Sequence, residues 1–264
     1  MFAYTTLLFV PGNRPDRFAK ATASGADAVI LDLEDAVADA DKDVARASVC
    51  EALGSGLRAI VRTNAVESPA GERDLAALAH LPLAAVMLPK TSGANDVDRA
   101  RSLLPDVSII ALVESVRGMR AIDAIAGAGV DAIVFGGYDL CAELGARPTP
   151  DVLAPWRSRV VFAARSANVA AIDTPFADIG DLAGLAADAG RTVDFGFDAK
   201  LAIHPSQIAP IRDAFTPGAR DVERARGIVA AATGGGVNTY EGTMIDMPLV
   251  IAARRVLARA GASA

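Results

Sequence analysis

Eight short apolar runs, each followed by a helix-like segment, limit the possible folds of this chain more than any other feature. They begin roughly 20 to 40 residues apart, at positions 7–10, 28–31, 59–61, 85–88, 108–113, 132–135, 169–172 and 200–203. Their apolar character is continuous instead of alternating, which indicates strands buried on both faces. Eight strand-then-helix units predict an α/β fold, a closed (β/α)8 TIM barrel, and an open doubly wound sheet is the alternative with the same alternation.

A weak internal repeat supports the barrel. The segments that begin at Gly25, Gly129 and Gly196 share the pattern Gly-x-Asp-Ala, and each stands before one of the apolar runs. In this pattern glycine closes a helix, aspartate turns the chain and a strand begins. The repeat therefore predicts one βα module used several times.

The pattern changes after Phe215. Thr216-Pro217-Gly218 interrupts the chain, a charged helical stretch follows, and the three glycines within residues 233–237 predict a flexible joint before a last amphipathic helix. We therefore expect a catalytic barrel over residues 1–215 and a C-terminal helical extension over residues 216–264. The extension would act as a lid over the barrel mouth or over a neighbouring subunit.

Charge and hydropathy exclude several classes of protein. The chain carries 26 Lys and Arg against 32 Asp and Glu, a net charge of −6 without a basic block, which argues against a nucleic-acid partner. No apolar stretch approaches the ~18 residues of a membrane-spanning helix. No basic residue precedes the first apolar segment, so no secretory signal is expected and a cytoplasmic location is the default.

Polar residues follow seven of the apolar runs, where a barrel of this kind places its chemistry. They are Asp32, Glu34, Asp35, Arg62, Asn64, Lys90, Glu114, Asp139, Asp173 and His204. Each alone could be a helix cap or a surface charge. Together they predict an active site at the carboxyl ends of the strands.

Glu114 and Asp139 follow the neighbouring fifth and sixth runs. Two carboxylates in a partly dry mouth repel each other unless a proton or a cation lies between them, and Mg²⁺ commonly takes one or two protein carboxylates. We therefore predict a Mg²⁺ site at this pair. A hydrogen-bonded pair without metal is the alternative.

The basic candidates each have two interpretations. The planar guanidinium of Arg62 could bind a substrate carboxylate through two hydrogen bonds, or it could form an internal salt bridge to Glu34 or Asp35. Lys90 ends a strand as a Schiff-base lysine would, but acidic neighbours keep a lysine protonated, so an ion-pair role is favoured. His204 could be a base, and next to a proline it is more often a structural hydrogen bonder.

Seven ordered segments together resemble the citrate lyase β-subunit family, which is grouped with malyl-CoA and citramalyl-CoA lyases in the HpcH/HpaI aldolase superfamily. They are residues 8–18 (LFVPGNRPDRF), 31–37 (LDLEDAV), 61–64 (VRTN), 88–91 (LPKT), 113–115 (VES), 135–139 (FGGYD) and 244–248 (MIDMP). The resemblance spans almost the whole chain. One departure is Tyr138, because many relatives have an acidic residue before the aspartate.

The resemblance implies a Mg²⁺-dependent enzyme that breaks or forms a carbon–carbon bond in a 3-hydroxyacyl thioester such as citryl-, malyl- or citramalyl-CoA. The partners would be an acyl-CoA or acyl-carrier thioester and a 2-oxo acid. Glu114 and Asp139 match the metal ligands, and Arg62 matches the arginine that grips the oxo acid and the developing enolate oxygen. Asp246 matches an acid/base that reaches a neighbouring subunit, commonly in a homotrimer. The polar residues around the metal waters match Glu34, Asp35 and Lys90.

Three other activities and one non-catalytic role remain open from the residues. A thioesterase for malyl-CoA would use the same metal and carboxylates to direct water. A metal-dependent aldolase would act on free 2-oxo acids, although the segment around Asp246 counts against it. A Schiff-base aldolase would use Lys90, and a non-catalytic interaction barrel would need none of these groups.

Overall fold

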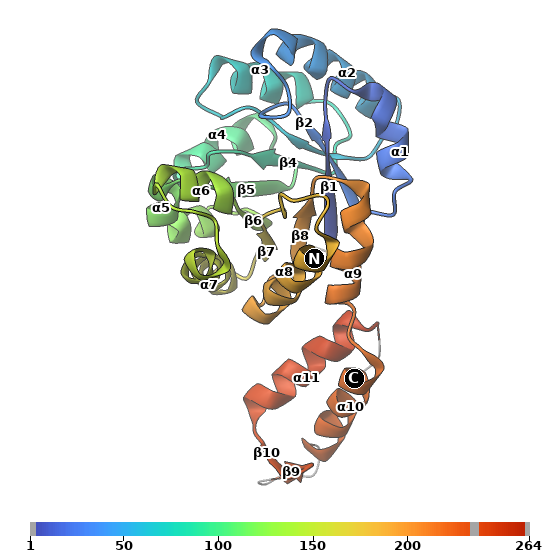
Figure 1. The fold of residues 1–264 in the computed structure, drawn as a ribbon. Coiled ribbons are helices and arrows are strands. Elements are labelled where there is room, and N and C mark those ends of the chain that lie inside the picture. Colours follow the sequence, from blue (N-terminus) through green and yellow to red (C-terminus); the bar gives the residue numbers. More distant parts are fainter. Residues whose placement is uncertain (1–3, 233–237, 262–264) are drawn as a thin grey trace. The chain divides into compact units, whose positions relative to one another are not determined.

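A computed structural model describes residues 4–232 and 238–261. The chain divides into two compact units, Met1–Ile211 and Arg212–Ala264. In the first, eight parallel strands pair in sequence order, and β1 (Thr6–Pro11) also pairs with β8 (Ala199–Ala202), with Leu7 opposite Leu201 (Figure 1). The strands between them are β2 (Ala28–Asp32), β3 (Ile60–Arg62), β4 (Ala85–Leu88), β5 (Ile109–Val113), β6 (Ala132–Phe135) and β7 (Ala170–Asp173). The predicted (β/α)8 barrel is confirmed, and the open sheet is wrong because the last strand returns to the first.

Helices connect the strands and surround the barrel (Figure 1). The α-helices of this part are α1 (Phe18–Thr22), α2 (Lys42–Gly54), α3 (Pro69–Leu78), α4 (Ala94–Leu103), α5 (Val116–Gly127), α6 (Gly137–Glu143), α7 (Pro150–Ser166) and α8 (Leu182–Phe195). Short 3-10 turns lie at η1 (Pro15–Arg17), η2 (Asp39–Asp41) and η3 (Pro205–Gln207). α9 (Ile208–Phe215) spans the division between the two units.

Alternating side chains of the eight strands fill the barrel. Its buried interior includes Leu7, Ile30, Ile60, Met87, Ile110, Leu112, Val134, Ile172 and Leu201. Because side chains alternate along a strand, positions two residues further on face the same interior, closer to the carboxyl ends. Those positions include Asp32, Arg62, Glu114, Gly136 and Thr174. The fold therefore gives the mouth a set of polar side chains above an apolar plug.

The Gly-x-Asp repeat has a physical role at the opposite end. Its glycines, Gly25, Gly129 and Gly196, have φ of 88°, 82° and 91°, which favour residues without a Cβ. Each aspartate accepts a hydrogen bond from an N–H near the start of the preceding strand, Asp27 from Thr6, Asp131 from Ile109 and Asp198 from Ala171, at 2.9 to 3.0 Å. The repeat thus ties neighbouring strands together where they begin.

The second unit has a core of its own. It consists of α10 (Ala219–Ala232), a hairpin of β9 (Asn238–Tyr240) and β10 (Thr243–Ile245), and α11 (Met247–Arg259). Ala225 and Ile228 of α10 are buried with Ala253 of α11. The predicted glycine joint at 233–237 lies outside the described residues. The lid role of residues 216–264 stays a prediction.

None of the helices within residues 4–232 and 238–261 has the length and apolar character needed to cross a membrane.

Candidate active site

A pocket of about 350 Å³ opens at the carboxyl ends of the strands. Its lining comprises Phe9, Pro11, Asp32, Asp35, Ala36, Arg62, Leu112, Glu114, Phe135, Gly136, Tyr138, Asp139, Thr174, Pro175, Leu201 and Ile203. The structure thus brings together five of the residues predicted for the site, namely Asp32, Asp35, Arg62, Glu114 and Asp139.

Arg62 is held in one orientation by Asp32. The two residues are register partners on β3 and β2, and the guanidinium binds Asp32 through Nε–Oδ1 at 2.7 Å and Nη2–Oδ2 at 2.6 Å. Nη1 also lies 3.0 Å from Glu34 Oε2, and the guanidinium stacks 4.7 Å from the centre of the Phe9 ring. Burial lowers the pKa of Arg62, but the hydrogen bonds and charge of Asp32 outweigh burial and raise it above its ordinary value. Arg62 is therefore a permanent cation at the mouth.

Asp32 is the partner of Arg62 that sequence reasoning missed. The salt bridge expected to Glu34 or Asp35 is present, with Asp35 3.5 Å from Nη1, but the two-point contact is made by Asp32. Two strand positions at the same level of neighbouring parallel strands, each two residues beyond a buried isoleucine, are the signal that could have found this pair.

Lys90 connects the acidic residues of the mouth. Its Nζ lies 2.8 Å from Glu34 Oε1 and 3.8 Å from Asp35 Oδ1, while its backbone N–H donates to Glu114 Oε1 at 2.7 Å. A φ of 53°, unusual for a residue with a Cβ, accompanies these contacts. The hydrogen bond to Glu34 raises the pKa of Lys90, so the amine stays charged. The ion pair expected of Lys90 is present, and a protonated amine is a poor nucleophile.

Glu114 is a buried carboxylate, only 4% exposed, that the protein compensates incompletely. Burial, assisted by the charges of Glu34 and Asp139, raises the pKa of Glu114 to about 8. Gly136 provides the space, because a Cβ there would lie 2.2 Å from the Glu114 Cβ and 2.9 Å from its Oε2. A carboxylate that is buried near other negative charges is stabilised by a bound proton or by a nearby cation.

Asp139 supplies the second oxygen donor. Asp139 is exposed in the first turn of α6 and lines the same pocket as Glu114. The charge of Asp139 contributes to raising the pKa of Glu114. Hard oxygen ligands and an uncompensated buried charge fit Mg²⁺, which keeps several waters and binds few protein carboxylates. Within the described residues no three His, Cys, Asp or Glu side chains gather as a metal cluster. A cation at Glu114 and Asp139 would therefore take its remaining ligands from water or substrate.

Asn64, Asp173 and His204, also considered for the mouth, do not line this pocket. The Asn64 amide donates to Asp74 at 2.7 Å, and Asp173 faces outward from the barrel because it alternates with the inward Ile172. His204 is exposed and caps η3 by accepting the N–H of Ser206 through Nδ1. All three have structural roles, as the more conservative interpretation of His204 expected.

Behind β7 and β8, Asp173 belongs to a buried ionic cluster. Lys200 Nζ lies 3.0 Å from Asp173 and 2.7 Å from Asp188, and Arg157 binds the same two carboxylates. Lys200 also donates to the backbone oxygen of Thr174 at 2.7 Å. Burial raises the pKa of Asp173, but the charges of Lys200 and Arg157 outweigh it and lower that pKa below its usual range.

Asp246 lies in the second unit. It is exposed and caps α11, accepting the N–H of Leu249 at 3.0 Å. Met244, Met247 and Ile251 near it are 60%, 66% and 46% exposed. The approach of Asp246 to an active site stays a prediction.

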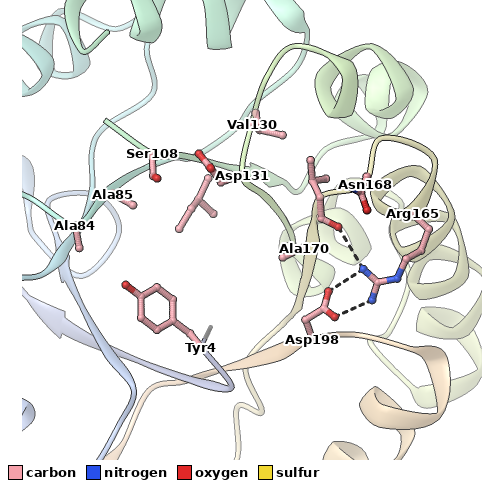
Figure 2. Close-up of a pocket in the computed structure, with 12 residues that line it drawn as sticks. Tyr4, Ala84, Ala85, Ser108, Val130, Asp131, Arg165, Asn168, Ala170 and Asp198 are labelled. Atoms are coloured by element: carbon pink, nitrogen blue, oxygen red, sulfur yellow. Dashed lines mark hydrogen bonds and ion pairs between the residues drawn. The ribbon is translucent and has the colours of Figure 1, made fainter. Parts of the chain in front are cut away.

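A larger hollow, about 660 Å³, lies at the opposite end of the barrel, where the strands begin. Figure 2 shows Arg165 paired through both branches with Asp198, at 2.9 Å for each contact. Asp131, also on its wall, binds the N–H of Ile109. These side chains hold strand ends together, which agrees with the structural role of this face in such barrels.

Known proteins match this chain over nearly its whole length. Residues 5–205 match the family model described as HpcH/HpaI aldolase/citrate lyase. A citrate lyase subunit beta-like protein of Mycobacterium tuberculosis is 39% identical, over 96% of this chain and 94% of that protein. A (3S)-malyl-CoA thioesterase of Cereibacter sphaeroides is 34% identical, over 99% and 96%. A crystal structure of CitE from M. tuberculosis with magnesium, acetoacetate and coenzyme A has a TM-score of 0.89 at 38% identity, covering 98% of each chain.

Proposed function

The chain belongs to the HpcH/HpaI aldolase/citrate lyase family, and from this premise we propose that it is a Mg²⁺-dependent carbon–carbon lyase. The substrate would be a 3-hydroxyacyl thioester of the citryl-, malyl- or citramalyl-CoA type, or its acyl-carrier equivalent, and the products an acyl thioester and a 2-oxo acid. The observation that carries the proposal is the buried Glu114 carboxylate, raised to a pKa of about 8 and facing the same pocket as Asp139 and Arg62.

Glu114 and Asp139 would hold Mg²⁺, which when bound supplies a Lewis acid for the oxygens of the oxo acid. Arg62 places a permanent positive charge where the enolate oxygen of the acyl fragment develops. Asp32 fixes the plane of that guanidinium through two hydrogen bonds, so the charge needs no reorientation during the reaction. The backbone N–H of Lys90 positions Glu114, and the Lys90 ammonium is itself held by Glu34.

Asp246 would move the proton at the acyl carbon. Its carboxylate is exposed on the second unit, between Met244 and Met247, whose side chains are also exposed. Exposed apolar side chains around a single carboxylate suit a surface that becomes buried in an assembly. We therefore infer that Asp246 serves a neighbouring copy in a homo-oligomer, a trimer by resemblance, and that the C-terminal extension closes the site. A cytoplasmic location remains the expectation.

A second candidate is a malyl-CoA-type thioesterase, supported by the relative of that name. The same carboxylates and Arg62 would then position water at the thioester carbonyl. An aldolase acting on free 2-oxo acids would use the metal pair without a thioester. The three activities share a site and differ in their products.

The test is to incubate the full chain with Mg²⁺ and citramalyl-, malyl- or citryl-CoA and to identify the products by mass. A lyase releases a 2-oxo acid and a shorter acyl-CoA, whereas a thioesterase releases free CoA and the intact hydroxy acid. Free malate and citramalate serve as controls for thioester-independent cleavage. Hydrolysis of the thioester without any 2-oxo acid would replace the lyase proposal by the thioesterase.

Sharing of the site between copies has its own test. The variants Arg62→Lys and Asp246→Ala should each lose most activity. A lysine at position 62 cannot reproduce the two-point contact with Asp32. An alanine at position 246 removes the proposed acid/base. Oligomers assembled from a mixture of the two should regain activity, because some sites would then combine an intact Arg62 with an intact Asp246. Full turnover by Asp246→Ala alone would remove its acid/base role.

A further inference from the structure

The mouth of the barrel has two unlike halves. Its charged lining residues lie at the end of β2 or β3, just after β2 or β5, or at the start of α6, namely Asp32, Asp35, Arg62, Glu114 and Asp139. The lining that follows or belongs to β7, β8 and β1 consists of Thr174, Pro175, Leu201, Ile203, Phe9 and Pro11. These three strands are neighbours in the closed barrel, so their residues form one continuous apolar wall.

Thr174 is the polar exception in this wall. Its side chain alternates with Ile172 and therefore faces the barrel interior, where it lines the pocket. The residue is 2% exposed, and its hydroxyl has no hydrogen-bond partner within the described residues. A buried hydroxyl without a partner is unfavourable, and near a pocket it is available to a ligand atom.

The backbone of Thr174 is fixed from behind. Lys200 donates to its carbonyl oxygen at 2.7 Å, and Lys200 is itself held by Asp173 and Asp188. Lys200 is fully buried behind the wall, so its charge is engaged there and does not reach the pocket. The hydroxyl of Thr174 is thus presented on a rigid support.

No basic side chain among the described residues lines the apolar half. The basic residue that lines the pocket, Arg62, stands on β3 and already binds Asp32, Glu34 and Asp35. It touches the wall at its β1 edge, where the guanidinium stacks on Phe9. A carboxylate of the substrate that lay against Leu201, which is only 2% exposed, would lose its water without gaining a cation there. Burial of an unpaired charge is strongly unfavourable.

We propose that the apolar half selects the oxo acid by its substituent, accepting hydrogen or a small alkyl group and rejecting a second carboxylate. The single carboxylate of the oxo acid is oriented toward the ionic half, and the hydroxyl of Thr174 makes one hydrogen bond to the bound substrate. This inference rests on the proposed lyase function and deepens it. It favours glyoxylate- or pyruvate-type products over oxaloacetate, and hence malyl- or citramalyl-type thioesters over citryl-type.

Binding of the oxo acids tests the inference separately from catalysis. Titration calorimetry of the full chain with Mg²⁺ should give a Kd for pyruvate or glyoxylate at least tenfold below that for oxaloacetate. Cleavage rates should follow, with kcat/KM for citryl-CoA at least 100-fold below the best of the other two thioesters. Equal or tighter binding of oxaloacetate would overturn the inference.

Ile203→Arg is the sharpest variant, because it places a cation on the wall at a residue that is already 38% exposed. It should improve oxaloacetate binding relative to pyruvate at least tenfold. Ile179→Arg, the same change at a 44% exposed isoleucine outside the pocket lining, should leave the ratio unaltered. An unchanged ratio in Ile203→Arg would also contradict the inference.

Thr174→Val removes the hydroxyl at nearly constant volume and should weaken pyruvate binding about fivefold to tenfold, whereas Thr174→Ser should lose less. Equal losses in both variants would remove the hydrogen bond from the inference. Binding of pyruvate without cleavage of any thioester would refute the lyase function and leave the selectivity standing. Absence of binding by all three oxo acids would refute both.

Discussion

Removal of the Lys200 ammonium is expected to destabilise the barrel severely. The buried cluster balances two cations, Lys200 and Arg157, against Asp173 and Asp188. In Lys200→Met one guanidinium faces two carboxylates, so one negative charge is left uncompensated in the interior. Removing one partner of a buried ion pair costs about 3–5 kcal/mol, which for a unit of this size lowers the Tm by roughly 6–20 °C.

Urea unfolding followed by circular dichroism measures this change in the free energy of unfolding. Lys20→Met, at an exposed lysine of α1, is the matched control and should change it little. Lys200→Met combined with Asp188→Asn restores the charge balance and should recover a large part of the loss. A loss below about 1 kcal/mol in Lys200→Met, or none of it recovered in the double variant, would refute the reasoning.

The pH dependence of Lys200→Met has a definite sign. The pKa of Asp173 is lowered in the folded protein, so the stability that its ionised form contributes is present above the ordinary carboxyl range. That contribution is lost as the pH falls through the folded pKa. The difference between wild type and Lys200→Met should therefore shrink on acidification, and a difference that grows would contradict the assignment.

Three further predictions concern the mouth. Because the pKa of Glu114 is raised to about 8, the folded metal-free protein binds more protons than the unfolded chain, so its stability should fall as the pH rises toward 8, by up to about 1.4 kcal/mol per pH unit. Glu114→Gln should flatten this fall, and parallel Tm–pH curves for variant and wild type would contradict it. Gly136→Ala should weaken Mg²⁺ binding at least tenfold in calorimetry because its Cβ would displace Glu114, whereas Gly127→Ala, with open space around it, should bind normally. EDTA should abolish turnover while borohydride with substrate should leave Lys90 unmodified in peptide mass maps, and a reduced adduct on Lys90 would establish a Schiff base instead.

Most of the fold was predictable because buried parallel strands leave a strong local signal. All eight predicted strands are present, and their ends differ from the predicted ones by one residue at most. The motifs at the strand ends also identified the family, which the comparisons confirm. Continuous apolar runs do not show which alternate side chains face inward, however. For that reason Asp173 was expected at the mouth although it faces the outer helices.

The arrangement of the mouth could not be predicted from the sequence, because it depends on contacts between residues of different strands. Asp32 and Arg62 meet because their strands pair with these two residues in register, which a single strand does not reveal. The need for Gly136 comes from the approach of Glu114, a residue 22 positions earlier in the numbering. Thr174 stands out because its buried hydroxyl has no hydrogen-bond partner within the described residues, which a sequence pattern does not show. Distances between elements, which sequence patterns do not contain, decided each of these points.

The aspartates of the Gly-x-Asp repeat stabilise the end of the barrel at which the strands begin, whereas the proposed active site lies at the end at which the strands finish. They accept hydrogen bonds from N–H groups near the start of the preceding strands, at the end of the barrel opposite the proposed active site. Closure of the cylinder is therefore secured where no substrate enters. Substitutions of residues at the mouth therefore leave these three hydrogen bonds in place.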